Sequence, residues 1–278
     1  MNHMQDAQLM ATPYFREAGT GPGVVCLHAN ASSSSQWRAL TDRLAVRFHV
    51  LAPDSLGAGK SGDWPDAGRV TLRDEATFLE PVFRRAGDPF VLVAHSYGAA
   101  VALVAAASLP GRISALALYE PTLFALLDQE SPAPNDADGI RQAAALAGAA
   151  LDAGNPDHAA AYFIDYWMGD GTWERTPEAR KPSIAASVSH IRQWESALST
   201  EPTPLSAFAA LDIPVLYMTG TESPASSRSV ARLLLSVLPN AQHVEFEGLG
   251  HMGPVTHADS VNDVICRFIE STVSATNR

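Results

Sequence analysis

The sequence is poor in cysteine, in positive charge and in long apolar runs, and each shortage excludes a class of protein. Its 278 residues include 2 cysteines, Cys26 and Cys266, far apart in the chain and in apolar surroundings. We expect both to be small buried side chains rather than a disulfide or a metal pair. Lys and Arg number 19 against 30 Asp and Glu, which gives a formal charge of −11. That sign argues against nucleic acid and anionic lipid as partners, because both attract a clustered positive field.

No apolar run approaches the roughly 18 residues that span a bilayer. Residues 1–6 lack the basic region and apolar stretch of a secretory signal. A hydrophobic share of 46% is enough to bury a full core. We therefore expect a soluble, cytoplasmic globular protein whose partner is a small-molecule substrate, with no nucleic acid and no membrane; a homodimer is left open.

Short apolar runs alternate with helical stretches in the first 120 residues. The runs favour Val and Leu without strict alternation, as do strands buried on both faces of a parallel sheet. These expected strands cover residues 23–27, 48–52, 90–94 and 113–119, and the expected helices between them cover 36–46, 72–85 and 97–108. Strands that alternate with helices predict repeated βαβ units and an α/β fold.

The pattern changes after Glu120-Pro121. A polar, Pro-containing loop over 128–138 precedes purely helical patterns over 140–151, 156–168 and 177–198, and a Pro-rich stretch at 201–204 closes the segment. The alternation then resumes with strands at 213–218 and 243–246 and helices at 226–238 and 260–273. This predicts one sheet domain, residues 1–121 and 206–278, interrupted by an all-helical insertion over 122–205.

The strongest local motif is Val-Leu-Val-Ala-His-Ser-Tyr-Gly-Ala-Ala at residues 91–100. A buried strand runs straight into Ser96, and a helix rich in small residues follows. Such a sharp turn strains the backbone at the serine and exposes its hydroxyl at the carboxyl edge of the sheet. Gly98 and its small neighbours allow the strand and the helix to approach closely.

This motif resembles the nucleophile elbow of the α/β-hydrolase family, small-x-Ser-x-Gly, with Ala94 at the first small position. The resemblance extends over residues 12–272. It implies a mostly parallel sheet of the eight-stranded type flanked by helices, with an all-helical cap inserted after the sixth strand. It also implies that Ser96 is a catalytic nucleophile.

A serine nucleophile needs a histidine base, which in this family lies on a loop after the last strand. His251 has that place, in a loop with glycines on both sides, Gly250 and Gly253. His257 is the rival, but we expect it to start or precede the final helix. His95 adjoins the serine and should point away from the pocket, so we favour His251.

The acid that orients the histidine has two candidates. In many relatives it is an Asp three residues after a Gly that ends a strand, but here Gly220 is followed at that distance by Ser223. Glu222 lies one residue earlier. The other family location is the end of the strand after the nucleophile helix, where this chain has Glu120. A carboxylate there needs a partner such as a histidine N–H. We favour Glu120 and keep Glu222 as the alternative.

The oxyanion hole should consist of two backbone amides. The resemblance implies Tyr97, directly after the nucleophile, and Asn30, in a loop that reads His28-Ala29-Asn30 where the family has His-Gly-x. Alternatively, Asn30 and the serines behind it only make the turn into the next helix.

Two further segments carry weaker signals. The Gly-rich run at residues 54–61 lacks the spacing of a phosphate-binding loop and matches a structural turn of α/β-hydrolases. In the expected cap, Tyr162 and Tyr166, or Phe163 and Trp167, share a helix face at i, i+4 spacing. We expect one of these pairs to face the substrate pocket.

Together these residues predict a serine hydrolase that cleaves a small, mainly apolar carboxylic ester, lactone or thioester through an acyl-enzyme, without a metal or organic cofactor. The rivals are a carbon–carbon bond hydrolase or a cofactor-free perhydrolase on the same fold, and a non-catalytic small-ligand receptor. Haloalkane dehalogenases resemble the chain at His-x-Asn and at Glu120. They use Asp as nucleophile, so Ser96 argues against dehalogenation and epoxide hydrolysis.

Overall fold

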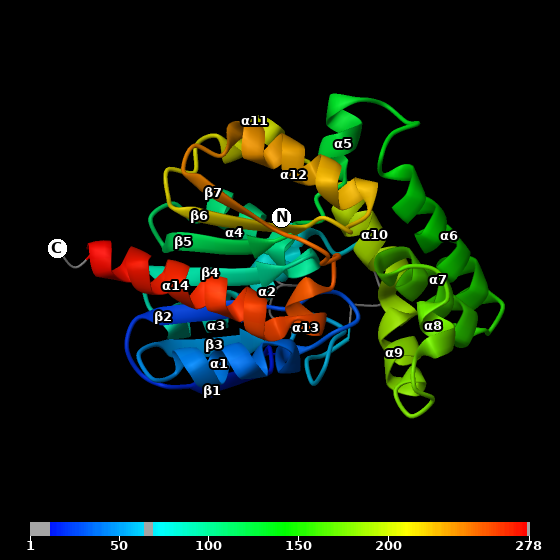
Figure 1. Cartoon of the computed structure of the whole chain (residues 1–278), viewed down its shortest axis with the longest axis horizontal. Coiled ribbons are helices and arrows are strands. Elements are labelled where there is room, and N and C mark those ends of the chain that lie inside the picture. Colours follow the sequence, from blue (N-terminus) through cyan, green and yellow to red (C-terminus); the bar gives the residue numbers. More distant parts are fainter. Residues whose placement is uncertain (1–11, 64–68, 277–278) are drawn as a thin grey trace, which may run out of the picture.

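The computed structural model describes residues 12–63 and 69–276. Its centre is a sheet whose strands follow the order β1-β3-β2-β4-β5-β6-β7, parallel except for β1, which pairs antiparallel with β3 (Figure 1). The strands are β1 (Phe15–Ala18), β2 (Gly23–Leu27), β3 (His49–Pro53), β4 (Phe90–His95), β5 (Ile113–Tyr119), β6 (Val215–Gly220) and β7 (Ala241–Phe246). The predicted α/β class with a mostly parallel sheet is therefore confirmed.

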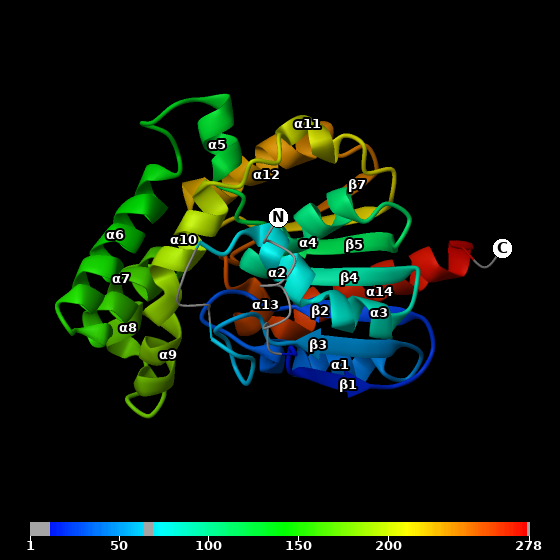
Figure 2. The same ribbon diagram turned by 180° about the vertical axis from the view of Figure 1, so that it is seen from behind.

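Helices cover both faces of the sheet (Figures 1 and 2). Alternate residues of each strand face opposite layers: Val24 and Cys26 pack with α1 and α14, whereas Val25 and Leu27 pack with α2, α3, α4 and α12. These helices are α1 (Arg38–Leu44), α2 (Leu72–Phe78), α3 (Glu80–Ala86), α4 (Tyr97–Ser108), α12 (Ala225–Val237) and α14 (Ala258–Thr276). Two short ones, the 3-10 helix η2 (Ser34–Trp37) and α13 (Gly253–Thr256), precede α1 and α14.

Several boundaries differ from the prediction for local reasons. The predicted helix over 72–85 is two helices, because Pro81 has no N–H to continue α2 and instead lies in the first turn of α3. The short, partly exposed β1 was not predicted. The described residues form seven strands rather than eight, and the insertion follows the fifth of them; residues 1–11 lie outside the description. Both cysteines are free, Cys26 buried and Cys266 only half-buried.

The described segment between β5 and β6 contains helices and no strand, and its helices α6 to α10 lie beyond one end of the sheet (Figure 1). Its elements are α5 (Ala125–Glu130), α6 (Asp138–Asp152), α7 (Pro156–Met168), α8 (Thr172–Arg175), α9 (Lys181–Ser187), the 3-10 helix η3 (Val188–His190), α10 (Ile191–Ser199) and α11 (Leu205–Phe208). Helices α6 to α10 pack on one another, whereas α5 and α11 contact α12 of the sheet layers. Within the described residues, no helix is long and apolar enough to cross a membrane.

Two predictions for this segment need correction, and the expected domain boundary coincides with a helix. The predicted loop over 128–138 begins with the last turn of α5, which continues to Glu130. The predicted helix over 177–198 is interrupted by η3, where the Ser187 hydroxyl donates to the Ile184 carbonyl and competes with regular helix bonding. The predicted boundary between residues 205 and 206 falls inside α11.

The approach of α4 to β2 gives a test of the packing. A Cβ at Gly98 would lie 2.6 Å from the His28 carbonyl oxygen and 2.8 Å from the Leu27 carbonyl carbon, backbone atoms that cannot rotate away. We expect Gly98→Ala to lower the free energy of unfolding by about 2 kcal/mol or more, as overpacked cores do. Urea denaturation measures it. Ala107→Gly, at an exposed position of the same helix, is the control and should cost only about 1 kcal/mol; equal stability of Gly98→Ala and the parent would contradict this account.

Candidate active site

Ser96 lies at the junction of β4 and α4 in a backbone conformation that is rare for residues other than glycine. Its φ is 57° and its ψ is −117°, so the strain predicted from the motif is present. The side chain is almost fully buried, and its hydroxyl lines a cavity between the sheet edge and the inserted helices. The turn therefore presents the hydroxyl to an enclosed space rather than to solvent.

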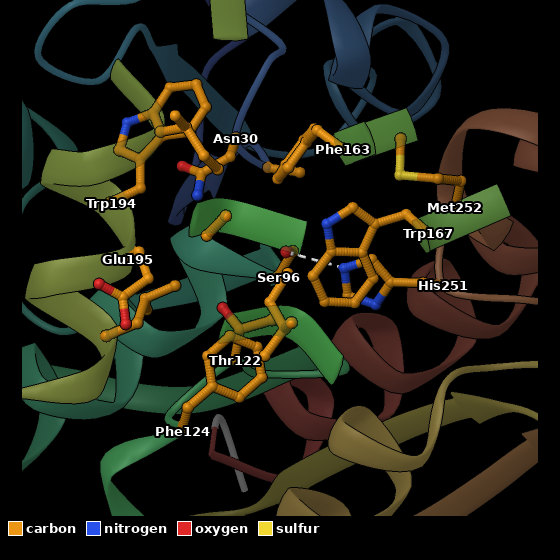
Figure 3. A pocket seen from close by; sticks show the side chains of 15 residues that line it. Asn30, Ser96, Thr122, Phe124, Phe163, Trp167, Trp194, Glu195, His251 and Met252 are labelled. Carbon is orange, nitrogen blue, oxygen red and sulfur yellow. Dashed lines mark hydrogen bonds between the residues drawn. The ribbon is translucent and has the colours of Figure 1, made fainter. Parts of the chain in front are cut away.

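A hydrogen-bonded chain connects Ser96 to a buried carboxylate. The His251 Nδ1 lies 2.7 Å from Glu120 Oε2, and its Nε2 lies 2.9 Å from Ser96 Oγ (Figure 3). Because a carboxylate can only accept, Nδ1 carries the proton, and Nε2 is free to accept from the serine. The structure thus brings together the three residues that the sequence singled out. The alternative acid, Glu222, is exposed and is not part of this chain.

Glu120 is fully buried, and both of its carboxylate oxygens have partners. While Oε2 faces His251, Oε1 accepts the Gly220 N–H at 2.8 Å and the Ser223 hydroxyl at 2.5 Å. Glu120 itself has a positive φ of 45° at the end of β5. Many relatives carry the acid at the position of Ser223. In this chain the Ser223 hydroxyl instead donates to the carboxylate of Glu120, which follows β5.

His251 is enclosed by two rings. The indole of Trp167, from α7, stacks on it with ring centroids 4.0 Å apart and an angle of 25° between the planes. On another side lies the His95 ring, with centroids 5.1 Å apart. His95 donates from Nε2 to the His251 carbonyl oxygen at 2.8 Å, and burial lowers its pKa. It therefore supports the loop of His251 and does not approach the serine, as predicted.

The other candidate residues from the sequence take no part in the hydrogen bonds that connect Ser96, His251 and Glu120. His257 is exposed, ends α13 and bonds the Thr256 hydroxyl. Of the two aromatic pairs on α7, Phe163 and Trp167 line the cavity. Tyr162 is exposed, and Tyr166 bonds the Ser226 hydroxyl at 2.7 Å. The prediction that one pair faces the pocket is confirmed for Phe163 and Trp167.

The loop after β2 is held by its own histidine. His28 donates from Nδ1 to the Ala29 carbonyl oxygen at 2.7 Å and accepts the Ser55 N–H on Nε2 at 3.0 Å. Burial lowers its pKa, which favours this neutral state. Gln36, which the sequence reasoning missed, accepts the Ala29 N–H and reaches His95. This loop places Asn30 in the wall of the cavity.

The Gly-rich turn is structural, as predicted. The buried Asp54 carboxylate accepts the Ser34 N–H at 2.6 Å and the Lys60 N–H at 2.8 Å. A Cβ at Gly59, whose φ is +56°, would lie 2.1 Å from that carboxylate, so the position requires glycine. Because Asp54 accepts these amides itself, the turn ties the loops after β2 and β3 together and does not form an anion cradle.

The cavity itself is small and mostly apolar. It measures about 30 Å³, enough for about one or two water molecules. Residues from the sheet edge and from the inserted helices share its wall: Ala29, Asn30, Ser96, Thr122, Phe124, Ile140, Ala144, Phe163, Trp167, Ile191, Trp194, Glu195, Leu198, His251 and Met252. In the described part of the chain, no group of three or more His, Cys, Asp or Glu side chains is arranged to hold a metal ion.

Another buried carboxylate, that of Glu75, lies behind the turn at Ser96. Glu75 of α2 accepts the Leu56 N–H at 3.0 Å and the Tyr97 hydroxyl at 3.3 Å. No cation among the described residues pairs with it, and burial raises its pKa to about 7. The sequence reasoning did not single it out, because a glutamate in an amphipathic helix is ordinarily exposed.

A family model described as the alpha/beta hydrolase fold matches residues 22–258, most of the chain. The chain belongs to the α/β-hydrolase fold family. The expectation of a hydrolase with this fold is therefore confirmed. A solved alpha/beta hydrolase from Sphaerobacter thermophilus is 30% identical, with a TM-score of 0.65 and coverage of 84% of this chain and 88% of that one.

More distant comparisons bear on the fold. A thermophilic esterase from Thermogutta terrifontis has a TM-score of 0.72 at 22% identity, covering 94% of this chain and 93% of that one; this likeness shows the fold alone. A haloalkane dehalogenase from Agrobacterium fabrum is 37% identical over 108 residues, which is 38% of this α/β-hydrolase and 35% of the relative. That match spans about a third of the relative's length.

The raised pKa of Glu75 predicts a pH-dependent stability difference. A proton that the folded state holds up to a pH of about 7, and the unfolded state releases near 4.5, stabilises the fold at low pH and is lost as the pH rises through 7. Glu75→Gln removes this dependence. Relative to wild type, we expect its free energy of unfolding to rise by up to about 3 kcal/mol from pH 5 to pH 8.

Urea denaturation of both proteins at the two pH values measures that difference. Subtracting the wild type cancels the opposing contribution of the buried histidines, whose lowered pKa values destabilise the fold at acid pH. Glu130→Gln, on an exposed position of α5, is the matched control and should show no such pH dependence. A constant offset for Glu75→Gln would show that the carboxyl does not titrate in this range.

Proposed function

We propose that this α/β-hydrolase is a serine hydrolase that cleaves small, mainly apolar carboxylic esters through an acyl-enzyme. The observation that carries the proposal is the buried chain from Ser96 through His251 to Glu120, with its serine end in a closed apolar cavity. A lactone or thioester presents the same reactive carbonyl, so both belong to the proposed substrate class. The partner is the substrate alone.

The first half of the reaction forms the acyl-enzyme. His251 Nε2 takes the proton of Ser96 as Oγ attacks the carbonyl carbon, and the backbone amides of Tyr97 and Asn30 receive the oxyanion. The tetrahedral intermediate then collapses and its carbon–oxygen bond to the alcohol breaks. His251 gives the same proton to the departing alcohol, which leaves neutral while the acyl group stays on Ser96.

The second half repeats these steps with water. His251 removes a proton from a water molecule that attacks the acyl carbon, and it returns that proton to Ser96 Oγ as the ester bond breaks. The charged imidazolium forms twice per cycle. Glu120 stabilises it through the Nδ1 hydrogen bond, and the stacked Trp167 indole adds a cation–π interaction that a neutral imidazole does not make.

The inserted helices define the substrate. In this proposal residues 122–205 act as a cap on a core of residues 1–121 and 206–278, and the cap supplies most of the apolar wall of the cavity. A cavity of about 30 Å³ cannot hold an acyl chain without displacement of these side chains. The space favours short acyl groups and disfavours long-chain lipids.

The partial likeness to haloalkane dehalogenases does not extend to the nucleophile. Displacement of a halide by Ser96 would leave an ether on the enzyme, and an ether has no carbonyl for water to attack. An acyl group on Ser96 is an ester, which the same site can hydrolyse. The serine therefore favours acyl transfer over dehalogenation.

The nucleophile is tested by reaction with a fluorophosphonate probe, which labels an activated serine covalently. We expect labelling of the wild type and none of Ser96→Ala, together with turnover of p-nitrophenyl acetate and butyrate that falls by about 10⁵-fold or more in the variant. A labelled protein that hydrolyses no ester would favour the carbon–carbon bond or perhydrolase alternatives. Failure of the probe to label the wild type would contradict the serine nucleophile and favour the non-catalytic receptor.

The acid is tested by Glu120→Gln, with Glu222→Gln as the matched control. An amide at position 120 can donate to His251 Nδ1 and so favour the wrong tautomer, so we expect kcat on p-nitrophenyl butyrate to fall by about 10³- to 10⁴-fold. Glu222 is exposed and is not hydrogen-bonded to His251, so Glu222→Gln should retain wild-type kcat. Near-normal turnover of Glu120→Gln would reject it as the triad acid.

A further inference from the structure

The hydroxyl of Thr122 is a polar group without a partner in the wall of the cavity. Thr122 is 1% exposed, and its Oγ1 makes no hydrogen bond to the described residues. Eight buried side-chain atoms in the described part of the chain lack a partner, and Thr122 Oγ1 is the one that belongs to the cavity lining. In Figure 3 this oxygen is turned toward the space enclosed by Asn30, Trp194 and Glu195.

An unpaired buried hydroxyl costs about 1–3 kcal/mol. Residue 122 is also fixed, because it follows Glu120-Pro121 at the end of β5 and its carbonyl oxygen accepts the Phe124 N–H at 2.9 Å. Of the other hydroxyl and acidic groups in the wall, Ser96 pairs with His251 at 2.9 Å, and Glu195 accepts the Ser199 hydroxyl at 2.8 Å. The cavity therefore contains one rigidly placed hydroxyl that a bound molecule could satisfy.

The sheet order tells which part of a substrate this hydroxyl meets. Strand β4, which carries Ser96, lies between β2 and β5. Of the two amides proposed for the oxyanion, that of Tyr97 directly follows Ser96 and that of Asn30 lies in the loop after β2, whereas Thr122 lies after β5. A group bonded to the reacting carbon, rather than the carbonyl oxygen, must then lie against Thr122.

That group is the acyl chain. A larger groove of about 610 Å³ runs between the loops after β2 and β3 and helix α9, and Trp194 lines both this groove and the catalytic cavity. The groove is open and lies on the side away from β5, so it suits departure of the alcohol. The enclosed space by Thr122, Phe124 and Ile140 is left for the acyl chain.

We propose that Thr122 is a specificity-determining residue that donates a hydrogen bond to an oxygen on the acyl chain, so that the preferred substrates are short hydroxyacyl or oxoacyl esters. The inference rests on the proposed ester hydrolysis and names its substrate class. Most of the remaining wall is apolar, so the preferred acyl chain is a short hydrocarbon frame with an oxygen placed at Thr122.

The test compares ethyl butyrate with ethyl 2-hydroxybutyrate, ethyl 3-hydroxybutyrate and ethyl 3-oxobutyrate, with acid release followed in a pH-stat. For the wild type we expect kcat/KM to be about tenfold higher for at least one oxygenated ester, the value of one good hydrogen bond. Thr122→Val, which is isosteric, should reduce this ratio to about one. Thr122→Ser, which keeps the hydroxyl, should retain the preference.

Thr41→Val is the matched control. Its hydroxyl is also buried without a partner, but it lies on α1, outside the cavity, so the ratio should stay at the wild-type value. A wild type without preference for any oxygenated ester, or a preference that survives in Thr122→Val, would overturn the proposal while ester hydrolysis stands. Failure of the wild type on all four esters, with fluorophosphonate labelling absent, would overturn the proposed function as well.

Discussion

The hydrogen bond between His251 and the buried Glu120 is the interaction on which the rest of the site depends. A carboxylate at the inner edge of a sheet is costly to ionise unless its oxygens are paired. Here the pairing comes from two segments: the histidine loop, and the connection that follows β6, where the Gly220 N–H and the Ser223 hydroxyl donate. The Glu120 carboxylate therefore links the ends of β5 and β6 to the histidine loop. Its hydrogen bond to Nδ1 fixes the orientation of the His251 ring.

Much of this could be predicted from local patterns. Strands β4 and β5 and helix α4 depend on runs of apolar residues and on a turn with one feasible geometry. The sequence could therefore single out Ser96, His251 and Glu120 as candidates before any fold was known. The choice of Glu120 over Glu222 followed from the cost of a buried charge, which a sequence can suggest. The structure adds the donors that satisfy that charge.

What the sequence could not supply depends on packing between distant segments. The stack of Trp167 on His251, the contact of Gln36 with His95 and the buried Glu75 all arise where helices meet strands, loops or other helices from distant parts of the chain. The break at η3 depends on competition between the Ser187 hydroxyl and the backbone for hydrogen bonds. The short β1 depends on pairing with β3 at the edge of the sheet. Neither segment has a strong hydrophobic periodicity in the sequence, so the predicted element boundaries were least accurate there.

The position of Trp167 has a consequence for how this enzyme could acquire new substrates. One side chain of α7 forms part of the cavity wall and also stacks on the His251 ring, which in the proposed mechanism carries the proton. Reshaping that helix for a larger molecule would therefore disturb acid–base chemistry at the same time. Evolution toward wider selectivity has a less costly route through α6 and α10, whose residues in the wall contact neither the histidine nor its acid in the interactions described.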